Sequence, residues 1–219
     1  MAGRGEIDSL SKKVNPQVFM LDKNNNWVPA TDPVHFDKPV AGVGPAISFA
    51  TEMLRSDPKI KIGLVPCAWG GSSIKVWEPD SSYLTGHPYD DAVHRTKIAM
   101  QQGVLKGILW HQGESDNTPQ GVEYYMEKIK TLVARFRNEF NIPDLPFVAG
   151  EIGYFVKSTR INPVLNQIPQ HITNAATVSA EGLTPNADQI HFNTASAREL
   201  GKRYAIAMKQ LQLGWMRKF

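Results

Sequence analysis

The sequence predicts an α/β domain in which helices cover both faces of a mostly parallel sheet. Short apolar runs alternate with longer amphipathic stretches along the whole chain, and the connections between them are short. The 219 residues are enough for one such domain with a sizeable core. Strands and helices that alternate in this way form right-handed crossovers in a parallel sheet. We therefore expect residues 1–219 to form a single domain, without internal repeats or a linker.

Four apolar runs have the length and composition of strands. They are Lys59–Pro66, Val104–Trp110, Leu145–Ala149 and Ala176–Val178. The first three are expected to be buried on both faces of the sheet. Gln17–Leu21 is a further short apolar run, and the asparagine-rich stretch that follows it predicts a peripheral strand or hairpin.

Five stretches carry apolar residues at helical spacing. Pro45 suits the first turn of the first of them, and Gly103 ends the second. The third is the longest internal one and has a continuous apolar stripe. The predicted helices are Pro45–Leu54, Asp90–Gly103, Gly121–Phe140, Asn162–Ala175 and Thr194–Leu213.

Composition and charge exclude several classes of protein. The 24 basic and 21 acidic residues give a net charge of only +3, and the basic residues are dispersed, so we expect no nucleic-acid partner. No apolar run approaches the roughly 18 residues of a membrane span. The single cysteine, Cys67, excludes an internal disulfide framework and a multi-cysteine zinc site. No secretory signal is visible in the first ten residues, which points to the cytoplasm if Met1 is the natural start.

Polar, glycine-rich segments follow four of the predicted strands. These segments are residues 67–73, 111–116, 150–153 and 188–192. Ligands in parallel α/β sheets bind beyond the carboxyl ends of the strands. The four segments are therefore expected to converge on one rim and to form a binding or active site.

Asp188 and His191 are spaced so that one turn of chain can bring their side chains together. A carboxylate that accepts a hydrogen bond from one ring nitrogen fixes the imidazole tautomer and leaves the other nitrogen as a base. Ester hydrolysis needs such a base, together with a nucleophile and an oxyanion hole. The alternative is that Asp188 merely caps the following segment.

Gly70 and Gly71 allow a sharp turn with exposed amide N–H groups, which suits an oxyanion, although a plain tight turn would look the same. Gln112 could offer a side-chain amide to the same oxyanion. Ser72 and Ser73 are candidate nucleophiles, but the stretch lacks the G-x-S-x-G elbow. A hydrogen bond to substrate or a helix N-cap is the alternative role for either serine.

Glu114 could orient Gln112 or bind a sugar hydroxyl. A metal site made of His111, Glu114 and Asp116 is a further hypothesis, disfavoured because no second histidine lies at helical spacing. Three tryptophans flank these loops and could stack on sugar rings, and the alternative for the last of them is a place in the core: Trp69, Trp77 and Trp110.

Three strings of sequence together resemble a known family. They are IGLVPCAWGGSSIKVW at residues 62–77, GILWHQGESD at 107–116 and DQIHF at 188–192, and GVGPAISFA at 42–50 extends the likeness over nearly the whole chain. The block W-H-Q-G-E-S-D is highly specific. The sequence is similar to carbohydrate esterase family 6 and the sialate O-acetylesterases, within the SGNH (GDSL) hydrolases, a group that includes acetylxylan esterases.

This resemblance implies a flavodoxin-like three-layer αβα sandwich that removes acetyl groups from sugar hydroxyls without a metal or cofactor. By position, His191 resembles the general base and Asp188 its orienting carboxylate. Gly71 resembles the backbone oxyanion donor, with Gly70 as the alternative. Gln112 takes the side-chain oxyanion role, and the remaining candidates for substrate binding or support of the loops are Glu114, Ser72 and Trp69.

The sequence departs from the family at its start. Family members begin with an apolar strand that leads into G-Q-S-N-M-A-G-R-G, whose serine is the nucleophile, and Met1–Gly5 matches that motif only from its methionine onward. We therefore expect the first family strand and the nucleophile to be absent from residues 1–219. Either the gene product is longer, or Gln17–Leu21 or a partner chain fills the gap in the sheet.

The sequence thus supports a carbohydrate O-acetylesterase with a Ser-His-Asp mechanism, inactive without its serine. Two alternatives stay open: a non-catalytic module that binds acetylated carbohydrate, and an esterase that uses Ser72 or Ser73. The sugar and the oligomeric state are not determined by the sequence.

Overall fold

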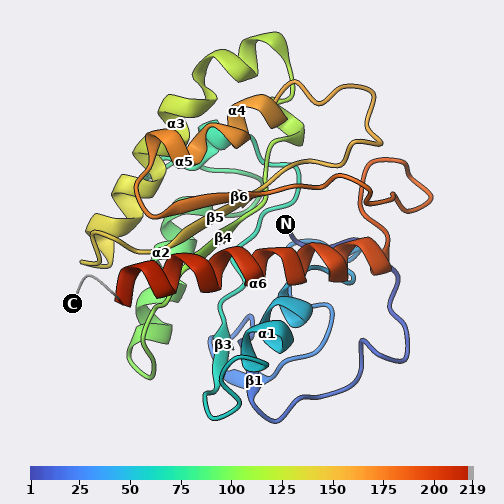
Figure 1. Cartoon of the computed structure of the whole chain (residues 1–219), viewed down its shortest axis with the longest axis vertical. Helices are drawn as coiled ribbons and strands as arrows, with labels where there is room; N and C mark the ends of the chain where they lie inside the picture. Colours follow the sequence, from blue (N-terminus) through green and yellow to red (C-terminus); the bar gives the residue numbers. More distant parts are fainter. Residues whose placement is uncertain (217–219) are drawn as a thin grey trace.

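The strands form two separate three-stranded sheets (Figure 1). In the first sheet, β1 pairs antiparallel with β2 and parallel with β3. In the second, β5 lies between β4 and β6 and is parallel to both. The strands are β1 (Val18–Leu21), β2 (Trp27–Pro29), β3 (Ile62–Leu64), β4 (Ile108–Trp110), β5 (Phe147–Gly150) and β6 (Ala175–Val178). This computed structural model describes residues 1–216.

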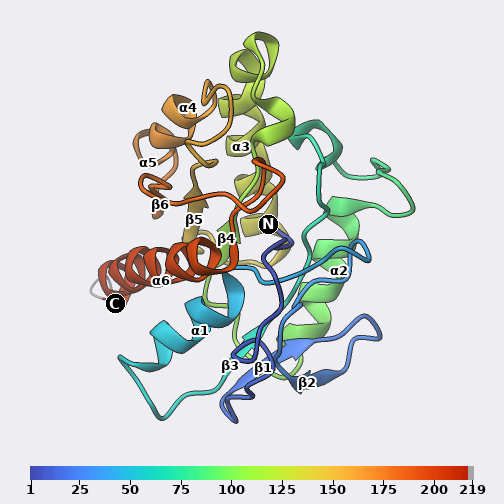
Figure 2. The same cartoon turned by 90° about the vertical axis from the view of Figure 1, so that its right-hand side faces the viewer.

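Helices pack on both faces of these sheets, as the turned view shows (Figure 2). On one face, Phe49 and Tyr204 from α1 and α6 form a core with Val148 of β5. On the other face, helices α2–α5 pack against alternate strand residues such as Trp110 and Phe147. The helices are α1 (Ala46–Leu54), α2 (Pro88–Met100), α3 (Pro119–Glu139), α4 (Asn162–Asn166), α5 (Ile168–His171) and α6 (Thr194–Met216). The predicted α/β fold with mostly parallel strands between helical layers is confirmed, although the strands form two sheets rather than one.

The helix boundaries follow from local sequence. Pro88 and Pro119 occupy the first turns of α2 and α3, where the missing N–H costs no hydrogen bond. Thr118 caps α3 by accepting a hydrogen bond from the amide of Gly121 at 2.9 Å. The apolar spacing predicted starts at residues 90 and 121, so both helices begin two residues earlier than predicted.

One predicted helix is wrong as drawn. The stretch Asn162–Ala175 forms two short helices, α4 and α5, and its last residue already belongs to β6. Pro169 has no N–H to donate to the preceding turn, so the helix is interrupted and restarts at Ile168. The other four predicted helices are confirmed within a few residues at each end.

The two sheets lie edge to edge, with the edge strand β3 of the first sheet opposite the edge strand β4 of the second. Residues 18–21, which were considered as a filler for a missing internal strand, pair with the other edge of β3 as β1, so that interpretation is wrong. Within residues 1–216 no strand lies between β3 and β4. The first sheet has one more strand than was defined from the sequence, because Trp27–Pro29 forms β2 and pairs antiparallel with β1. In the described part of the chain, no helix has the length and apolar character needed to cross a membrane.

Candidate active site

His191 and Asp188 form the predicted pair. The Nδ1 atom of His191 lies 2.7 Å from Oδ2 of Asp188. The other carboxylate oxygen accepts hydrogen bonds from the backbone amides of Ile190 and His191. Partial burial opposes ionisation of Asp188, but these hydrogen bonds outweigh it and lower its pKa to about 2. The carboxylate is therefore charged at neutral pH and orients the imidazole, whose Nε2 is left for proton transfer.

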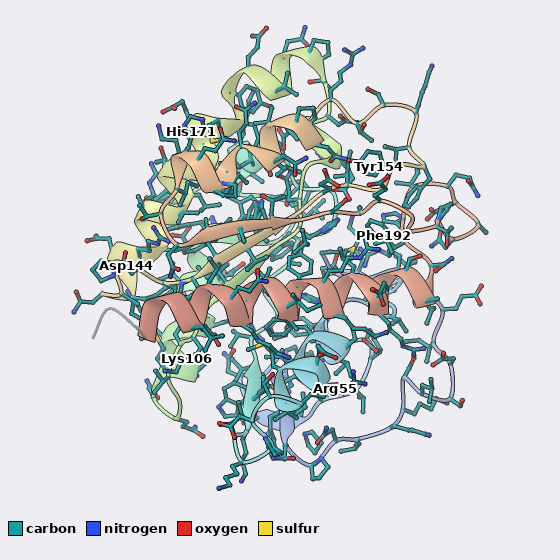
Figure 3. The ribbon with its side chains drawn as sticks, in the orientation of Figure 1. Arg55, Lys106, Asp144, Tyr154, His171 and Phe192 are labelled. Atoms are coloured by element: carbon teal, nitrogen blue, oxygen red, sulfur yellow. The ribbon has the colours of Figure 1, made fainter. Side chains whose placement is uncertain are left out.

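The loop that carries this pair is folded back on itself. Pro185 and Phe192 form an antiparallel bridge, and the amide of Asn186 donates to the carbonyl of His191 at 2.8 Å. Phe192 is buried and packs edge-to-face against Phe155. Figure 3 shows Phe192 toward the same end of the molecule as Tyr154, and far from Asp144 at the opposite end. The buried phenylalanine thus anchors a half-exposed histidine.

The loop after β3 separates the roles of the two glycines. The amide of Gly70 donates to Oδ2 of Asp37 at 3.0 Å and is therefore occupied. Gly71 has a φ of 84°, in the left-handed region that glycine tolerates best. Its carbonyl accepts from the hydroxyl of Ser115 at 2.8 Å. Because the amide of Gly70 is already bonded to Asp37, that of Gly71 is left as the candidate oxyanion donor.

Gln112 holds the loops after β3 and β4 together. Its Nε2 donates to the carbonyl of Ser72 at 3.0 Å and to Oδ2 of Asp116 at 2.6 Å. Its Oε1 accepts from the hydroxyl of Tyr125 at 2.8 Å. Both amide hydrogens are committed within the protein, so Gln112 would reach an oxyanion only after releasing one of these partners.

Asp116 is the residue that the sequence analysis underestimated. Its side chain is fully buried, and its two oxygens accept four hydrogen bonds. The donors are the hydroxyls of Ser73 and Tyr124, the amide of Ile74 and Nε2 of Gln112. Its place two residues beyond Glu114 in the specific H-Q-G-E-S-D block was the available signal. Asp116, not Glu114, orients Gln112.

Glu114 lies at the exposed rim of the site. Its Oε1 is 3.8 Å from Nε2 of His111, and its side chain is 38% exposed, which suits contact with a substrate hydroxyl. A metal bound by His111, Glu114 and Asp116 is disfavoured, because both oxygens of Asp116 already accept hydrogen bonds from protein donors. Among the described residues, no group of three or more His, Cys, Asp or Glu is arranged to hold a metal ion.

Ser72 and Ser73 make structural hydrogen bonds. The hydroxyl of Ser72 is buried and accepts from the indole of Trp77 at 3.0 Å. Ser73 caps a short 3₁₀ helix at Ile74–Val76 by accepting from the amide of Lys75, and it donates to Asp116. These contacts favour the N-cap and packing roles over that of an exposed nucleophile.

The three tryptophans differ in exposure. Trp77 and Trp110 are buried and meet edge-to-face at 4.9 Å between ring centroids, so a role in stacking on sugars is wrong for both. Trp69 is half-buried and covers Gly86, where an added Cβ would meet the indole at 2.4 Å. Trp69 alone of the three keeps an accessible surface near the loops.

Arg4 links the loop that carries Asp188 and His191 to the glycine loop. Its guanidinium donates to Asp37 at 2.8 Å, and the same carboxylate oxygen accepts from the amide of Gly70. Its carbonyl accepts from the side chain of Asn186 at 3.2 Å. The ring of His111 after β4 also meets that of Phe192, at 5.6 Å. The predicted convergence of loops is therefore supported by direct contacts.

Helices on both faces of mostly parallel sheets, with a His–Asp pair and a glycine turn beyond the strand ends, make up an α/β fold of the kind found in the SGNH carbohydrate esterases. The chain belongs to the carbohydrate esterase family of sialic acid-specific acetylesterases, which it matches over residues 1–210. It is also 34% identical over 205 residues to a probable carbohydrate esterase of Arabidopsis thaliana, covering 88% of this chain and 75% of that protein.

Solved structures support the fold. An Arabidopsis thaliana protein superposes with a TM-score of 0.85 at 31% identity, covering 96% of this chain and 93% of the other. NanS gives a TM-score of 0.75 at 19% identity over 100% of this chain and 94% of its own. A carbohydrate acetylesterase from Xanthomonas citri gives 0.69 at 21% identity, covering 92% of this chain and 51% of that one. The last two similarities concern the fold alone.

Proposed function

We propose that this protein hydrolyses acetyl esters on carbohydrate hydroxyls, with His191 as the general base. The observation that carries the proposal is the 2.7 Å contact between Nδ1 of His191 and Oδ2 of Asp188 in a member of a carbohydrate esterase family. Asp188 holds the imidazole, and the amide of Gly71 stabilises the oxyanion. Gln112 keeps the glycine loop in place and is the second candidate donor.

The chemistry follows the order of acyl transfer. Nε2 of His191 takes the proton of a nucleophilic hydroxyl as its oxygen attacks the acetyl carbonyl. The tetrahedral intermediate collapses when the imidazolium returns the proton to the sugar oxygen, which leaves as the free hydroxyl. Water, deprotonated by the same histidine, then attacks the acetyl-enzyme and releases acetate.

The attacking oxygen is proposed to come from a serine outside residues 1–219. The hydroxyls of Ser72 and Ser73 are engaged in packing and capping. The resemblance of Met1–Gly5 to the end of the G-Q-S-N-M-A-G-R-G motif supports this proposal, because the serine of that motif precedes its methionine by two residues. Residues 1–219 alone are therefore expected to turn over little ester.

The experiment compares residues 1–219 with a form extended upstream through the motif's serine, each with and without His191→Ala. Substrates are p-nitrophenyl acetate, acetylated xylo-oligosaccharide and O-acetylated sialic acid, and acetate release is measured. We expect turnover only in the extended form, abolished by the histidine change. Robust turnover by residues 1–219 that depends on His191 would contradict the missing serine.

Two further measurements separate the alternatives. Labelling of residues 1–219 by a fluorophosphonate, lost in Ser72→Ala or Ser73→Ala, would assign the nucleophile to that serine. Calorimetric binding of acetylated oligosaccharide with no acetate release, even by the extended form, would favour a binding module. The sugar is read from the ratio of kcat/KM values on the two carbohydrate substrates.

A further inference from the structure

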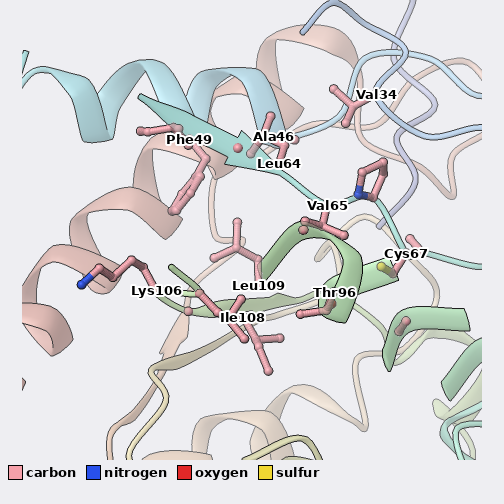
Figure 4. A pocket seen from close by; sticks show the side chains of 18 of the residues that line it. Val34, Ala46, Phe49, Leu64, Val65, Cys67, Thr96, Lys106, Ile108 and Leu109 are labelled. Atoms are coloured by element: carbon pink, nitrogen blue, oxygen red, sulfur yellow. The ribbon is translucent and has the colours of Figure 1, made fainter. Parts of the chain in front are cut away.

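A cavity of about 740 Å³ lies between the two three-stranded sheets. Figure 4 shows it between β3 and β4, with Leu64 and Val65 on one side and Ile108 and Leu109 on the other. Protein interiors are close-packed, and voids much larger than a water molecule are few. A cavity of this size, at the centre of the sheet and largely apolar, points to an occupant.

The facing edges of β3 and β4 define the backbone of that occupant. Each strand pairs along its other edge only, β3 with β1 and β4 with β5. Their carboxyl ends lie together, because Gln112 Nε2 donates to the carbonyl of Ser72 and the hydroxyl of Ser115 donates to that of Gly71. Both edges therefore run in the same direction. A strand placed between them could pair in parallel with β3 and β4 at once.

The lining of the cavity defines the side chains of the occupant. Ala46 and Phe49 approach it from α1, whereas Ala99 and Met100 approach from α2 on the opposite face. Alternate residues of an inserted strand would point to these two layers. A strand buried on both faces is continuously apolar rather than alternating.

Charge distinguishes the two ends of the cavity. Lys61 lines it at the amino end of β3, so acidic residues suit the start of the occupant. His111 lies at the carboxyl end, with a side chain only 3% exposed. Its Nε2 is buried and, among residues 1–216, has no hydrogen-bond partner.

The tautomer of His111 shows what this nitrogen needs. The hydroxyl of Tyr204 donates its one hydrogen to the carbonyl of Trp110 at 2.8 Å and lies 3.1 Å from Nδ1 of His111. Nδ1 must then carry the proton and donate to the tyrosine oxygen. Burial lowers the pKa of His111 to about 3, so the ring is neutral. Nε2 is therefore an acceptor that lacks a donor.

We propose that the cavity binds an extended apolar peptide segment as a parallel strand between β3 and β4. Its acidic start lies by Lys61, and a hydroxyl or amide donor at its end reaches Nε2 of His111. The inference concerns binding alone and does not require the proposed ester hydrolysis. Occupation would join the two sheets into one.

The experiment uses residues 1–219 and a synthetic peptide with two glutamates, five alternating isoleucine and valine residues, and a terminal serine amide. Binding is measured by calorimetry and hydrogen exchange. We expect saturable binding that slows exchange at residues 62–65 and 108–111 by about tenfold or more, because paired amides open only with the strand. Replacing the serine by alanine is expected to weaken binding about fivefold, the effect of one hydrogen bond.

Two controls make the outcome decisive. An N-methylated peptide with the same side chains cannot donate to the strand edges and is expected to bind at least about tenfold more weakly. On the protein, Ala46→Phe fills the cavity and should block binding, whereas Thr51→Phe, on the exposed side of the same helix, should not. Equal binding of the methylated peptide, or binding that leaves exchange in both strands unchanged, would overturn the inference. Competition by palmitate would also overturn it, if palmitate binds, displaces the peptide and leaves hydrogen exchange in β3 and β4 unchanged. The cavity would then be a site for apolar small molecules.

Discussion

Nε2 of Gln112 lies 2.6 Å from Oδ2 of Asp116, and this buried contact ties the glycine loop after β3 to the loop after β4. The same amide reaches the carbonyl of Ser72 on the glycine loop. Asp116 also accepts from Ile74 and Ser73, which follow that loop. A single carboxylate therefore sets the relative position of two of the loops around the proposed oxyanion site.

Asp116→Asn is expected to destabilise the protein by about 2–4 kcal/mol. The carboxamide keeps one acceptor oxygen and turns an amide toward donors such as Gln112 Nε2 or the hydroxyl of Tyr124, which leaves buried donors unsatisfied. Urea denaturation measures the change in the free energy of unfolding. The matched control is Asp80→Asn at an exposed position, expected within about 0.5 kcal/mol of the parent. Equal stability of both variants would remove Asp116 from its organising role.

Gly71→Ala is expected to reduce turnover by the serine-containing form about tenfold to a hundredfold. The φ of 84° strains any residue with a Cβ by about 1–2 kcal/mol, and relief of that strain rotates the amide away from the oxyanion. Steady-state kinetics on p-nitrophenyl acetate measures kcat.

Gly182→Ala separates strain from catalysis. Gly182 has a φ of 76° and open space around an added Cβ, so its substitution carries similar backbone strain. We expect a similar loss of stability with kcat nearly unchanged. Equal loss of kcat in both variants would show that the effect of Gly71→Ala is one of stability rather than of the oxyanion.

The sequence predicted four of the five helices and the places of the strands, because burial sets the apolar periodicity of these elements. The strands predicted at residues 59–66 and 104–110 are shorter than expected, and the first of them is not buried on both faces, since Gly63 of β3 is exposed. The sequence also predicted the contact between Asp188 and His191, because the two residues are three apart and the interaction is local. Pro169 was the readable signal for the break between α4 and α5. Applying the rule that proline interrupts a helix would have corrected that prediction.

Other features depend on contacts between distant segments. The carboxylate of Asp116 meets Ser73 and Ile74 across 42 or 43 positions of sequence, and no periodicity encodes such a pairing. The hydrogen bond from Gln112 to the carbonyl of Ser72 and the packing of Trp77 against Trp110 likewise join segments that are distant in sequence. The pairing of β1 with the outer edge of β3 required knowledge of strand order, which the apolar run at residues 17–21 does not contain.

Asp188→Asn is expected to lower kcat of the serine-containing form roughly 10³- to 10⁴-fold. Oδ1 of Asp188 accepts from two backbone amides, so the NH2 group of asparagine would replace Oδ2 opposite Nδ1 of His191. An NH2 group cannot accept a hydrogen bond from Nδ1–H, so the imidazole loses both its fixed tautomer and the negative charge that stabilises imidazolium. Kinetics with p-nitrophenyl acetate measures the loss. Glu181→Gln makes the same change of charge at an exposed position nearby and should retain activity. Turnover by Asp188→Asn at the parent rate would eliminate the proposed pair.

Asp32→Asn is expected to raise the melting temperature at pH 7.5 and to lose that advantage near pH 4. Asp32 is 8% exposed, and its Oδ1 is buried without a hydrogen-bond partner in the described part of the chain. Burial raises the pKa of Asp32 to about 6, against a smaller opposing effect of the hydrogen bond from the amide of Gly44.

The sign follows from proton binding. Between about pH 4 and pH 6 the folded protein holds a proton on Asp32 that the unfolded chain has released, so the contribution of Asp32 to stability falls as the pH rises through this window. At neutral pH the buried charge costs on the order of 1–3 kcal/mol, which the neutral asparagine avoids. Thermal unfolding of both proteins from pH 4 to 7.5 measures the difference, and the subtraction removes the titration of all other groups. The exposed Asp80→Asn should track the parent at every pH, and a gain for Asp32→Asn that is equal at pH 4 and pH 7.5 would show that its origin is packing rather than charge.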